Sequence, residues 1–237
     1  NWIENRDLKI INLTYNELQT YNIESLKPDS KYSNRFKKQQ SVKGAKISRL
    51  IDLFKLATEE ENKDVFLNLE IKSTPIEAGL TPDPQTLVSL ILKDIKEYNL
   101  ENRVVITSYD WRILYELKKQ NSNVLRGFIT LQQGLSKTKK NIYEDSPWMG
   151  KKFSPDELFL LPDTIKKLEG HVWSAFYKDV TKQNVEIAHK HGLAVTVWTV
   201  NREPDILRMI EYGVDGIITD YPKKVQEICK SKNISWF

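Results

Sequence analysis

The sequence has only one cysteine, Cys229, among its 237 residues. A single cysteine excludes an intramolecular disulfide and any metal site built from cysteines. Cysteine usage therefore does not indicate whether the protein resides in an oxidising or a reducing compartment. No apolar run approaches the ~18 residues of a membrane span, and the opening residues NWIENRDLKI lack a Met, a basic start and an apolar signal core. We therefore expect a globular protein without a transmembrane segment.

The chain also lacks a concentration of charge of one sign. Its 36 Lys and Arg and 32 Asp and Glu give a formal charge of +4 and are scattered along the whole length. Proteins that bind nucleic acid usually gather their basic residues into stripes or arms. The basic runs at 37–38, 118–119 and 137–140 are short and are interpreted as solvated faces, so no nucleic-acid partner is expected.

From residue 65 onward, short apolar runs alternate with amphipathic helical patterns, which is typical of βαβ units and a parallel sheet. We expect strands at 65–71, 103–109, 124–130, 171–176, 193–200 and 215–220. Helices are expected at 84–98, 110–120, 155–168, 181–191, 203–212 and 222–231. Six βα units result, and the length fits one domain, since a (β/α)₈ barrel takes about 250 residues.

Residues 1–64 contain no convincing strand. Thr14 and Glu17 have the spacing of a capping box and predict a short helix, and residues 47–60 carry apolar side chains at helical spacing. The segment 132–153 is long and polar for a βα loop, so we interpret it as a lid or a substrate-facing insertion.

In a parallel barrel, functional groups cluster at the carboxyl ends of the strands, where the βα loops converge. The rule selects Glu70, Lys72, Ser108, Tyr109, Asp110, Thr130, Ser174, Tyr177, Trp198, Thr199, Asn201, Thr219 and Asp220.

Glu70 and Lys72 lie two apart on one expected strand, so their side chains project to the same face. A carboxylate there suits Mg²⁺ or Ca²⁺, and an ammonium group suits phosphate oxygens. The pair could equally form an ion pair at the strand end. Both interpretations stay open on this pattern alone.

Two other residues have competing interpretations. Trp198 could present a ring wall to a small polar ligand or fill core volume. Asn201 could bind substrate or cap the helix that begins near residue 203.

The three histidines offer no catalytic constellation. His189 and His191 fall in the last turn of an expected helix, where positive charge favours the helix dipole. His171 begins a strand and is expected at the opposite, stability-determining face of the barrel.

The chain resembles the glycerophosphodiester phosphodiesterase family. The resemblance runs through FLNLEIK, VVITSYDWRIL, VWSAFYKDVT and, most specifically, AHKHGLAVTVWTVNREPDILRMIEYGVDGIITDYP. It implies a TIM-type (β/α)₈ barrel that hydrolyses glycerophosphodiesters to sn-glycerol 3-phosphate and an alcohol. One divalent cation, Ca²⁺ or Mg²⁺, and two histidines acting as general acid and base are implied as well.

The resemblance also assigns roles to residues. Glu70 resembles the third metal carboxylate, Lys72 the lysine that contacts the phosphate during catalysis, and Trp198 the aromatic wall beside the glycerol moiety. Ser108, Tyr109 and Asn201, which end strands in the matching stretches, are predicted to bind substrate.

The sequence departs from the family pattern at its start. The His-Arg-Gly strand, the Glu-x-Asp strand and the His-Asp pair are absent, so both catalytic histidines and two of the three metal carboxylates are missing and the site is incomplete. We expect residues 1–64 to join the second and third barrel units and residues 65–237 to form units three to eight of a single barrel domain.

The plainest account of this departure is that the sequence is a fragment of a longer polypeptide, and as written the chain is not expected to turn over. A second chain could instead complete the barrel, or the protein could be a non-catalytic barrel remnant that serves as a structural or interaction subunit. A related phospholipase acting on lipid head groups is a further alternative. Relatives with this pattern are often exported to the periplasm, but the sequence itself gives no compartment.

Overall fold

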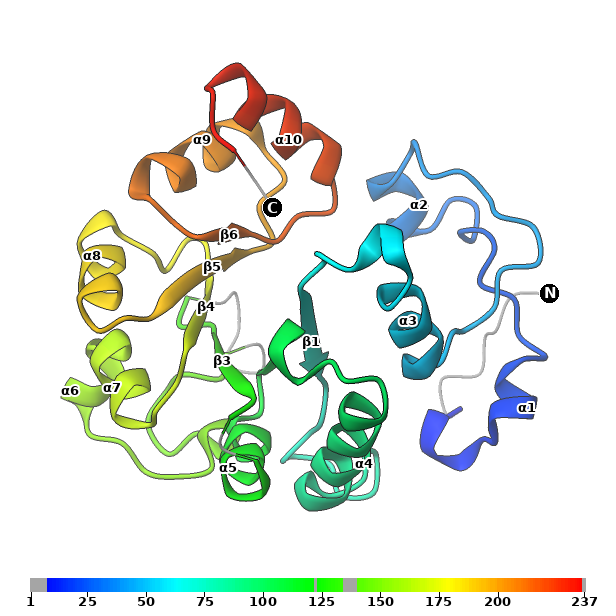
Figure 1. Ribbon diagram of the computed structural model, residues 1–237, viewed down its shortest axis with the longest axis horizontal. Helices are drawn as coiled ribbons and strands as arrows, with labels where there is room; N and C mark the ends of the chain where they lie inside the picture. The colour runs from blue at the N-terminus through cyan, green and yellow to red at the C-terminus, as the bar shows by residue number, and fades with distance from the viewer. Residues whose placement is uncertain (1–7, 122, 134–139, 236–237) are drawn as a thin grey trace.

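The sheet is the central feature of the computed structural model, which describes residues 8–121, 123–133 and 140–235. Six parallel strands lie in chain order and curl around a central space (Figure 1). The strands are β1 (Leu67–Ile71), β2 (Val104–Ser108), β3 (Leu125–Thr130), β4 (Val172–Phe176), β5 (Ala194–Trp198) and β6 (Gly216–Ile217). Among the described residues, β1 and β6 each pair on one side only.

Helices cover the outer face of the curled sheet (Figure 1). They are α4 (Pro84–Glu97), α5 (Trp111–Gln120), α6 (Pro155–Phe159), α7 (Leu161–Lys167), α8 (Lys182–Lys190), α9 (Glu203–Tyr212) and α10 (Pro222–Ser231). The strands all run in the same direction and are joined by helices, which is the parallel α/β architecture expected from the sequence. All the strand carboxyl ends therefore meet at one edge.

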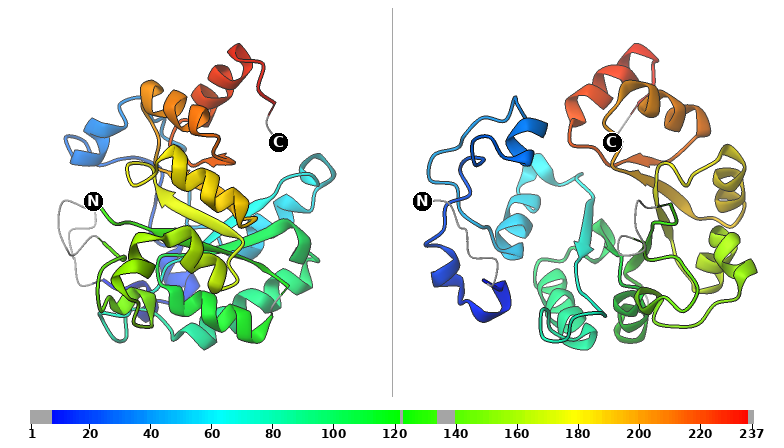
Figure 2. Two further views of the ribbon diagram at one scale, coloured as in Figure 1. Left: turned by 90° about the vertical axis from the view of Figure 1, so that its left-hand side faces the viewer. Right: turned by 180° about the vertical axis from the view of Figure 1, so that it is seen from behind.

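Residues 8–64 lie at the open side of the curl, next to β1 and facing α10 (Figures 1 and 2). They contain α1 (Tyr15–Leu18), α2 (Lys31–Arg35), α3 (Leu50–Ala57) and two 3₁₀ turns, and no strand. Phe54 and Ala57 of α3 belong to the same hydrophobic core as the sheet. Arg35 of α2 forms an ion pair with Asp220, whose carboxylate lies 3.0 Å away.

Capping explains where several of these helices begin. Thr14 and Glu17 form the predicted capping box of α1. Ser154 and Glu157 form another at α6, and Asp83 accepts a hydrogen bond from the Thr86 amide at the start of α4. These side chains satisfy backbone N–H groups that a helix leaves unpaired in its first turn.

Two expected elements differ from the structure. The helix expected at 155–168 is two helices, because the backbone leaves the helical region at Leu160 (φ −99°, ψ 61°) and Pro162 then starts a new helix as one of its first residues. The strand expected at 215–220 is only two residues long, and its continuation bonds irregularly to the end of β5. In the part of the chain that the structure describes, no helix is long and apolar enough to cross a bilayer.

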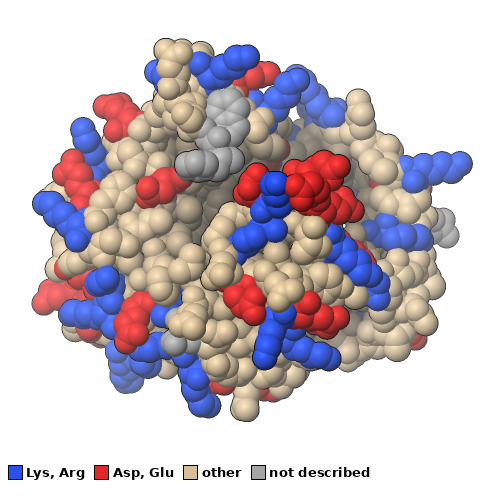
Figure 3. Space-filling view, viewed as in Figure 1, with Lys and Arg blue, Asp and Glu red and all other residues tan. Residues whose placement is uncertain are grey.

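Charges of both signs are interspersed over the face shown in Figure 3. This pattern agrees with the scattered charges of the sequence.

Candidate active site

A cavity of about 690 Å³ opens at the carboxyl ends of the strands. Side chains from five of the strands, from the residues that follow them and from one loop surround it. They are Asn68, Glu70, Lys72, Ser73, Thr107, Tyr109, Ile129, Leu131, Trp148, Ser174, Trp198, Thr199 and Ile218. Glu70, Lys72, Tyr109 and Trp198 of the predicted site therefore meet in one place.

Glu70 and Lys72 lie on the same side of β1 and the residues after it, as their spacing predicts. The Lys72 Nζ is 3.8 Å from the Glu70 Oε2, which is an ion-pair distance but too long for a hydrogen bond. The Lys72 side chain is 82% exposed and that of Glu70 is 42% exposed. A pair this exposed adds little to stability, so both groups can accept other partners at small cost.

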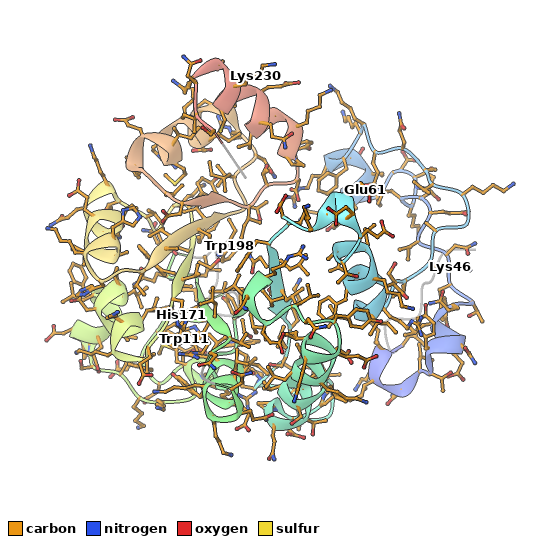
Figure 4. All side chains as sticks on the ribbon, in the orientation of Figure 1. Lys46, Glu61, Trp111, His171, Trp198 and Lys230 are labelled. Carbon is orange, nitrogen blue, oxygen red and sulfur yellow. The ribbon has the colours of Figure 1, made fainter. Side chains whose placement is uncertain are left out.

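Trp198 ends β5 and lines the cavity. Its indole Nε1 donates a hydrogen bond of 3.1 Å to the carbonyl oxygen of Ser174 on the neighbouring strand. The ring of Phe176 packs against it with centroids 5.5 Å apart. Figure 4 shows Trp198 near the centre of the curled sheet. The indole is thus held in one orientation and forms a wall of the cavity.

Tyr109 follows β2 and is half-buried against Trp148, with ring centroids 5.1 Å apart and planes at 77°. Burial is the main cause that raises the pKa of Tyr109 well above its usual range, and the charges of Tyr143 and Asp179 add to it. The phenol therefore stays protonated at neutral pH and is a weak acid there. It can shape the cavity but is poorly suited to donate a proton.

The floor of the cavity is polar. Thr107 on β2 donates a hydrogen bond of 2.9 Å to the Asn68 side-chain oxygen on β1. Ser174 on β4 is 1% exposed, and its hydroxyl has no hydrogen-bond partner in the described part of the molecule. These groups give the cavity hydrogen-bonding capacity beneath its aromatic walls.

Two of the predicted substrate-binding residues do not line this cavity. Ser108 is fully buried, and its hydroxyl donates to the Ile71 carbonyl oxygen at 2.8 Å and accepts from the Asp110 amide at 3.1 Å. Ser108 therefore joins the ends of β1 and β2 rather than facing a ligand. That Ser108 binds substrate stays a prediction, and in the structure its hydroxyl bonds to backbone groups.

Asn201 lies on a neighbouring cavity of about 760 Å³, together with Arg35 and Lys224. Its Nδ2 donates to Asp220 at 2.7 Å, and its Oδ1 accepts from the Thr219 hydroxyl and the Asp220 amide. The N-cap of α9 is Arg202, so Asn201 does not cap that helix either. Its amide instead ties the chain after β5 to the chain after β6.

The three histidines of the chain all lie outside the cavity. His171 precedes β4 and accepts a hydrogen bond from the Arg126 amide, and Figure 4 shows it farther out than Trp198. His189 pairs with Asp215 at 2.9 Å, and His191 pairs with Asp163 at 3.0 Å. Both lie at the end of α8, where the sequence placed them in the last turn of a helix.

The donor set of the cavity does not fit a bound divalent cation. Glu70 is the only carboxylate among the lining residues that the structure describes. Ca²⁺ takes about 6–8 oxygen ligands and Mg²⁺ about six. No group of three acidic, histidine or cysteine side chains suited to a metal ion occurs anywhere among the described residues. The residues present do not by themselves form a metal site.

Trp148 is one of the lining residues that sequence reasoning missed, together with Asn68, Ser73, Thr107, Ile129, Leu131 and Ile218. It lies in the 3₁₀ turn η5 (Pro147–Met149), within the long loop interpreted as a lid or substrate-facing insertion. Residues 134–139 of that loop lie outside the described residues. The available signal was an aromatic residue flanked by Pro147 and Gly150 in an otherwise polar stretch.

A parallel α/β sheet with a cavity at its carboxyl edge, holding an ammonium group, a carboxylate and aromatic walls, is the arrangement of barrel-type α/β proteins, whose ligand sites lie at that edge. The model of the glycerophosphoryl diester phosphodiesterase family matches residues 3–224. The chain belongs to this family, whose members are phosphoric diester hydrolases.

Individual relatives agree with the family match. A glycerophosphodiester phosphodiesterase of Caldanaerobacter subterraneus is 33% identical over 180 residues, which cover 76% of this chain and 60% of that protein. The match thus spans less than two thirds of that relative's length. A solved Silicibacter pomeroyi structure assigned to the same activity aligns with a TM-score of 0.83 and 29% identity, covering all of this chain and 74% of the other.

A second solved structure shows the same fold at lower identity. An Oleispira antarctica phosphodiesterase, solved in complex with its product sn-glycerol-3-phosphate, aligns with a TM-score of 0.55 and 17% identity.

Proposed function

We propose that the protein hydrolyses glycerophosphodiesters to sn-glycerol 3-phosphate and an alcohol. The observation that carries this proposal is that Glu70, Lys72 and Trp198 line one cavity at the carboxyl edge of the sheet. The activity named for the Caldanaerobacter relative and the product bound by the Oleispira phosphodiesterase support it.

Lys72 is assigned to the phosphoryl group. Its ammonium group is 82% exposed at the cavity, so it can meet a phosphoryl oxygen without first losing a strong partner. Negative charge grows on the phosphoryl oxygens as the attacking oxygen adds, and a fixed cation beside them lowers the barrier. Trp198 forms the wall along which the glycerol carbons pack.

Glu70 is assigned, by resemblance, as a ligand of a divalent cation. Because one carboxylate falls short of the ligands that Ca²⁺ or Mg²⁺ requires, no step is derived through an ion. The histidines of this chain lie away from the cavity, and the Tyr109 phenol is a weak acid, so the proton transfers are not assigned to any of them. Lys72 and Trp198 therefore bind the substrate, and Lys72 also stabilises the charge on the phosphoryl group.

The test is release of glycerol 3-phosphate from glycerophosphocholine, with and without a chelator, together with calorimetric binding of glycerol 3-phosphate. Lys72→Ala is expected to lower kcat/KM by about 100-fold or more, because one charge-stabilising donor is typically worth that much. Lys230→Ala is the matched control, since Lys230 is exposed on α10, far from the cavity (Figure 4).

Added metal is not expected to restore activity to Lys72→Ala, and recovery at high metal would contradict its phosphate role. If the protein neither releases nor binds glycerol 3-phosphate, the proposed function is wrong. The alternative of a non-catalytic barrel protein would then be preferred.

A further inference from the structure

The cavity has a second aromatic wall, formed by Tyr109 and Trp148, which we name the aromatic corner. Its two rings meet edge to face at 77°, and both are partly exposed to the cavity. A phosphodiester carries two alcohols, and the proposed function gives the Trp198 wall to the glycerol. The aromatic corner then remains for the second alcohol, and the inference below rests on that proposed function.

The aromatic corner is built rigidly, first through Asn141, which is fully buried. The Asn141 Nδ2 donates to the carbonyl oxygens of Tyr109 at 3.0 Å and Ile129 at 2.7 Å. Its Oδ1 accepts from the Leu131 amide at 2.8 Å. One amide side chain thus fixes the backbone beneath Tyr109 to the end of β3 and to the loop that carries Trp148.

A second tether holds the residue that follows Trp148. The Tyr115 hydroxyl on α5 donates a hydrogen bond of 2.8 Å to the Met149 carbonyl oxygen, and the Met149 side chain is fully buried. Gly150 closes the turn with φ 64°, a left-handed conformation that favours glycine. The turn that carries the Trp148 ring is thus held in place, so less of it has to be ordered when a ligand packs on the ring.

The chemistry of the corner selects among alcohols. The neighbouring lining residues Ile129 and Leu131 are apolar. These apolar side chains offer no hydrogen-bond partner to the hydroxyl groups of a polyol or to the N–H groups of a primary ammonium ion. A quaternary ammonium group has no N–H to satisfy, and its charge is attracted to the negative faces of aromatic rings.

The nearby fixed charge has the matching sign. Asp179 is buried close to Tyr109, and its carboxylate accepts the backbone amides of Gln132 at 2.7 Å and Gln133 at 3.0 Å. Lys72 also lines the cavity, but it serves the phosphate in the proposed function. From these contacts we infer that the aromatic corner binds the quaternary ammonium group of the leaving alcohol, so that choline-type diesters are preferred.

The test separates charge from shape. Glycerophosphocholine is compared with its neutral isostere, the 3,3-dimethylbutyl diester of glycerol phosphate, in which carbon replaces the ammonium nitrogen. Cation–π attraction at a partly desolvated site predicts a kcat/KM about tenfold higher for the choline diester. Trp148→Leu is expected to bring the ratio of the two close to one, mainly by lowering the choline value.

Phe159→Leu is the matched control, because Phe159 is 84% exposed on α6 and does not line the cavity. It is expected to leave the ratio unchanged. Equal kcat/KM values for the two diesters in the unmodified protein, or an equal loss of both in Trp148→Leu, would overturn the inference.

A binding experiment keeps this inference distinguishable from the proposed function. Tetramethylammonium and the neutral 2,2-dimethylpropanol are titrated into the protein while tryptophan indole signals are followed by NMR. Preference for tetramethylammonium that is lost in Trp148→Leu supports the aromatic corner even without turnover. Glycerol 3-phosphate binding without any such preference leaves the proposed function intact and rejects the inference.

Discussion

His171 has its protonation state set by its surroundings. Its Nδ1 accepts a hydrogen bond of 3.1 Å from the Arg126 amide, and a protonated imidazole has no acceptor to offer. Burial is the main cause that lowers the pKa of His171, and the charges of Arg126 and Lys166 lower it further. The folded protein thus holds this ring neutral.

This arrangement predicts how stability depends on pH. The folded pKa of His171 lies below the unfolded value of about 6.5, so the unfolded chain binds more protons between the two values. The stability that the neutral ring contributes is complete above about pH 6.5 and is lost as pH falls through the folded pKa. His171→Gln is expected to flatten the fall in unfolding free energy between about pH 7 and pH 5, measured by urea denaturation.

His189→Gln serves as the control for this prediction. His189 is 40% exposed and pairs with Asp215 at the surface, so its loss should leave the fall in place. An unchanged pH profile in His171→Gln would show that the neutral ring does not contribute.

Individual site residues could be predicted where the strand pattern fixes the side-chain direction. Glu70 and Lys72 lie two residues apart at the end of β1, Tyr109 follows β2 and Trp198 ends β5, so all four reach the cavity. Whether a polar side chain at a strand end faces a ligand or bonds a neighbouring backbone depends on contacts between strands. Sequence spacing does not contain those contacts, so it could not show that the Ser108 hydroxyl bonds to the Ile71 carbonyl oxygen.

Among the elements, the junction between α3 and β1 depends on one side chain. Arg103 in the 3₁₀ turn η3 (Glu101–Arg103) donates from Nη2 to the carbonyl oxygens of Ala57, Asn62 and Val65 at 3.0, 2.6 and 2.8 Å. Ala57 is the last residue of α3, where carbonyl groups lack partners within the helix. The hydrogen bonds of the guanidinium group therefore connect the end of α3 to the segment that leads into β1.

Arg103→Ala is expected to lower the unfolding free energy by about 2–3 kcal/mol, since hydrogen bonds to charged groups contribute about 1.5–3 kcal/mol and these share one donor group. Urea denaturation measures the loss. Arg208→Ala, which removes a partly exposed pair with Asp205 on α9, is expected to cost about 1 kcal/mol or less. Equal losses in the two variants would contradict the special role of Arg103.

Element types were predictable because hydrophobic periodicity and caps are local properties. The boundary at Leu160 was not, because the apolar pattern continues across the break between α6 and α7. The path of the loop that carries Trp148 could not be predicted from the sequence either. It is set by the bonds of Asn141 to residues 10 to 32 positions away in the chain.

At the scale of the whole molecule, burial divides the chain unevenly. Residues 8–49 contain no buried side chain, whereas every residue of β2 is buried. Segments with few buried contacts open at low free-energy cost, and core strands open near the global unfolding free energy. We expect fast amide exchange in residues 8–49 and slow exchange in β2, β3 and β4, measured by hydrogen exchange with mass spectrometry.

Residues 50–57 provide the internal comparison, because α3 places Phe54 and Ala57 in the core. Exchange there is expected to be slower than in residues 8–49. Equal protection of residues 8–49 and the central strands would show that contacts other than buried side chains stabilise that segment.

The strand order of the sheet has a consequence for how the protein is made. Among the residues that the structure describes, each strand pairs with the strands that precede and follow it in the chain and with no other. Every new pairing then joins strands that are neighbours in the chain, so its loop-closure entropy costs less than a pairing between the two ends of the chain would. During synthesis from the N-terminus, each unit can dock on the one just completed as it leaves the ribosome, without waiting for a distant part of the polypeptide.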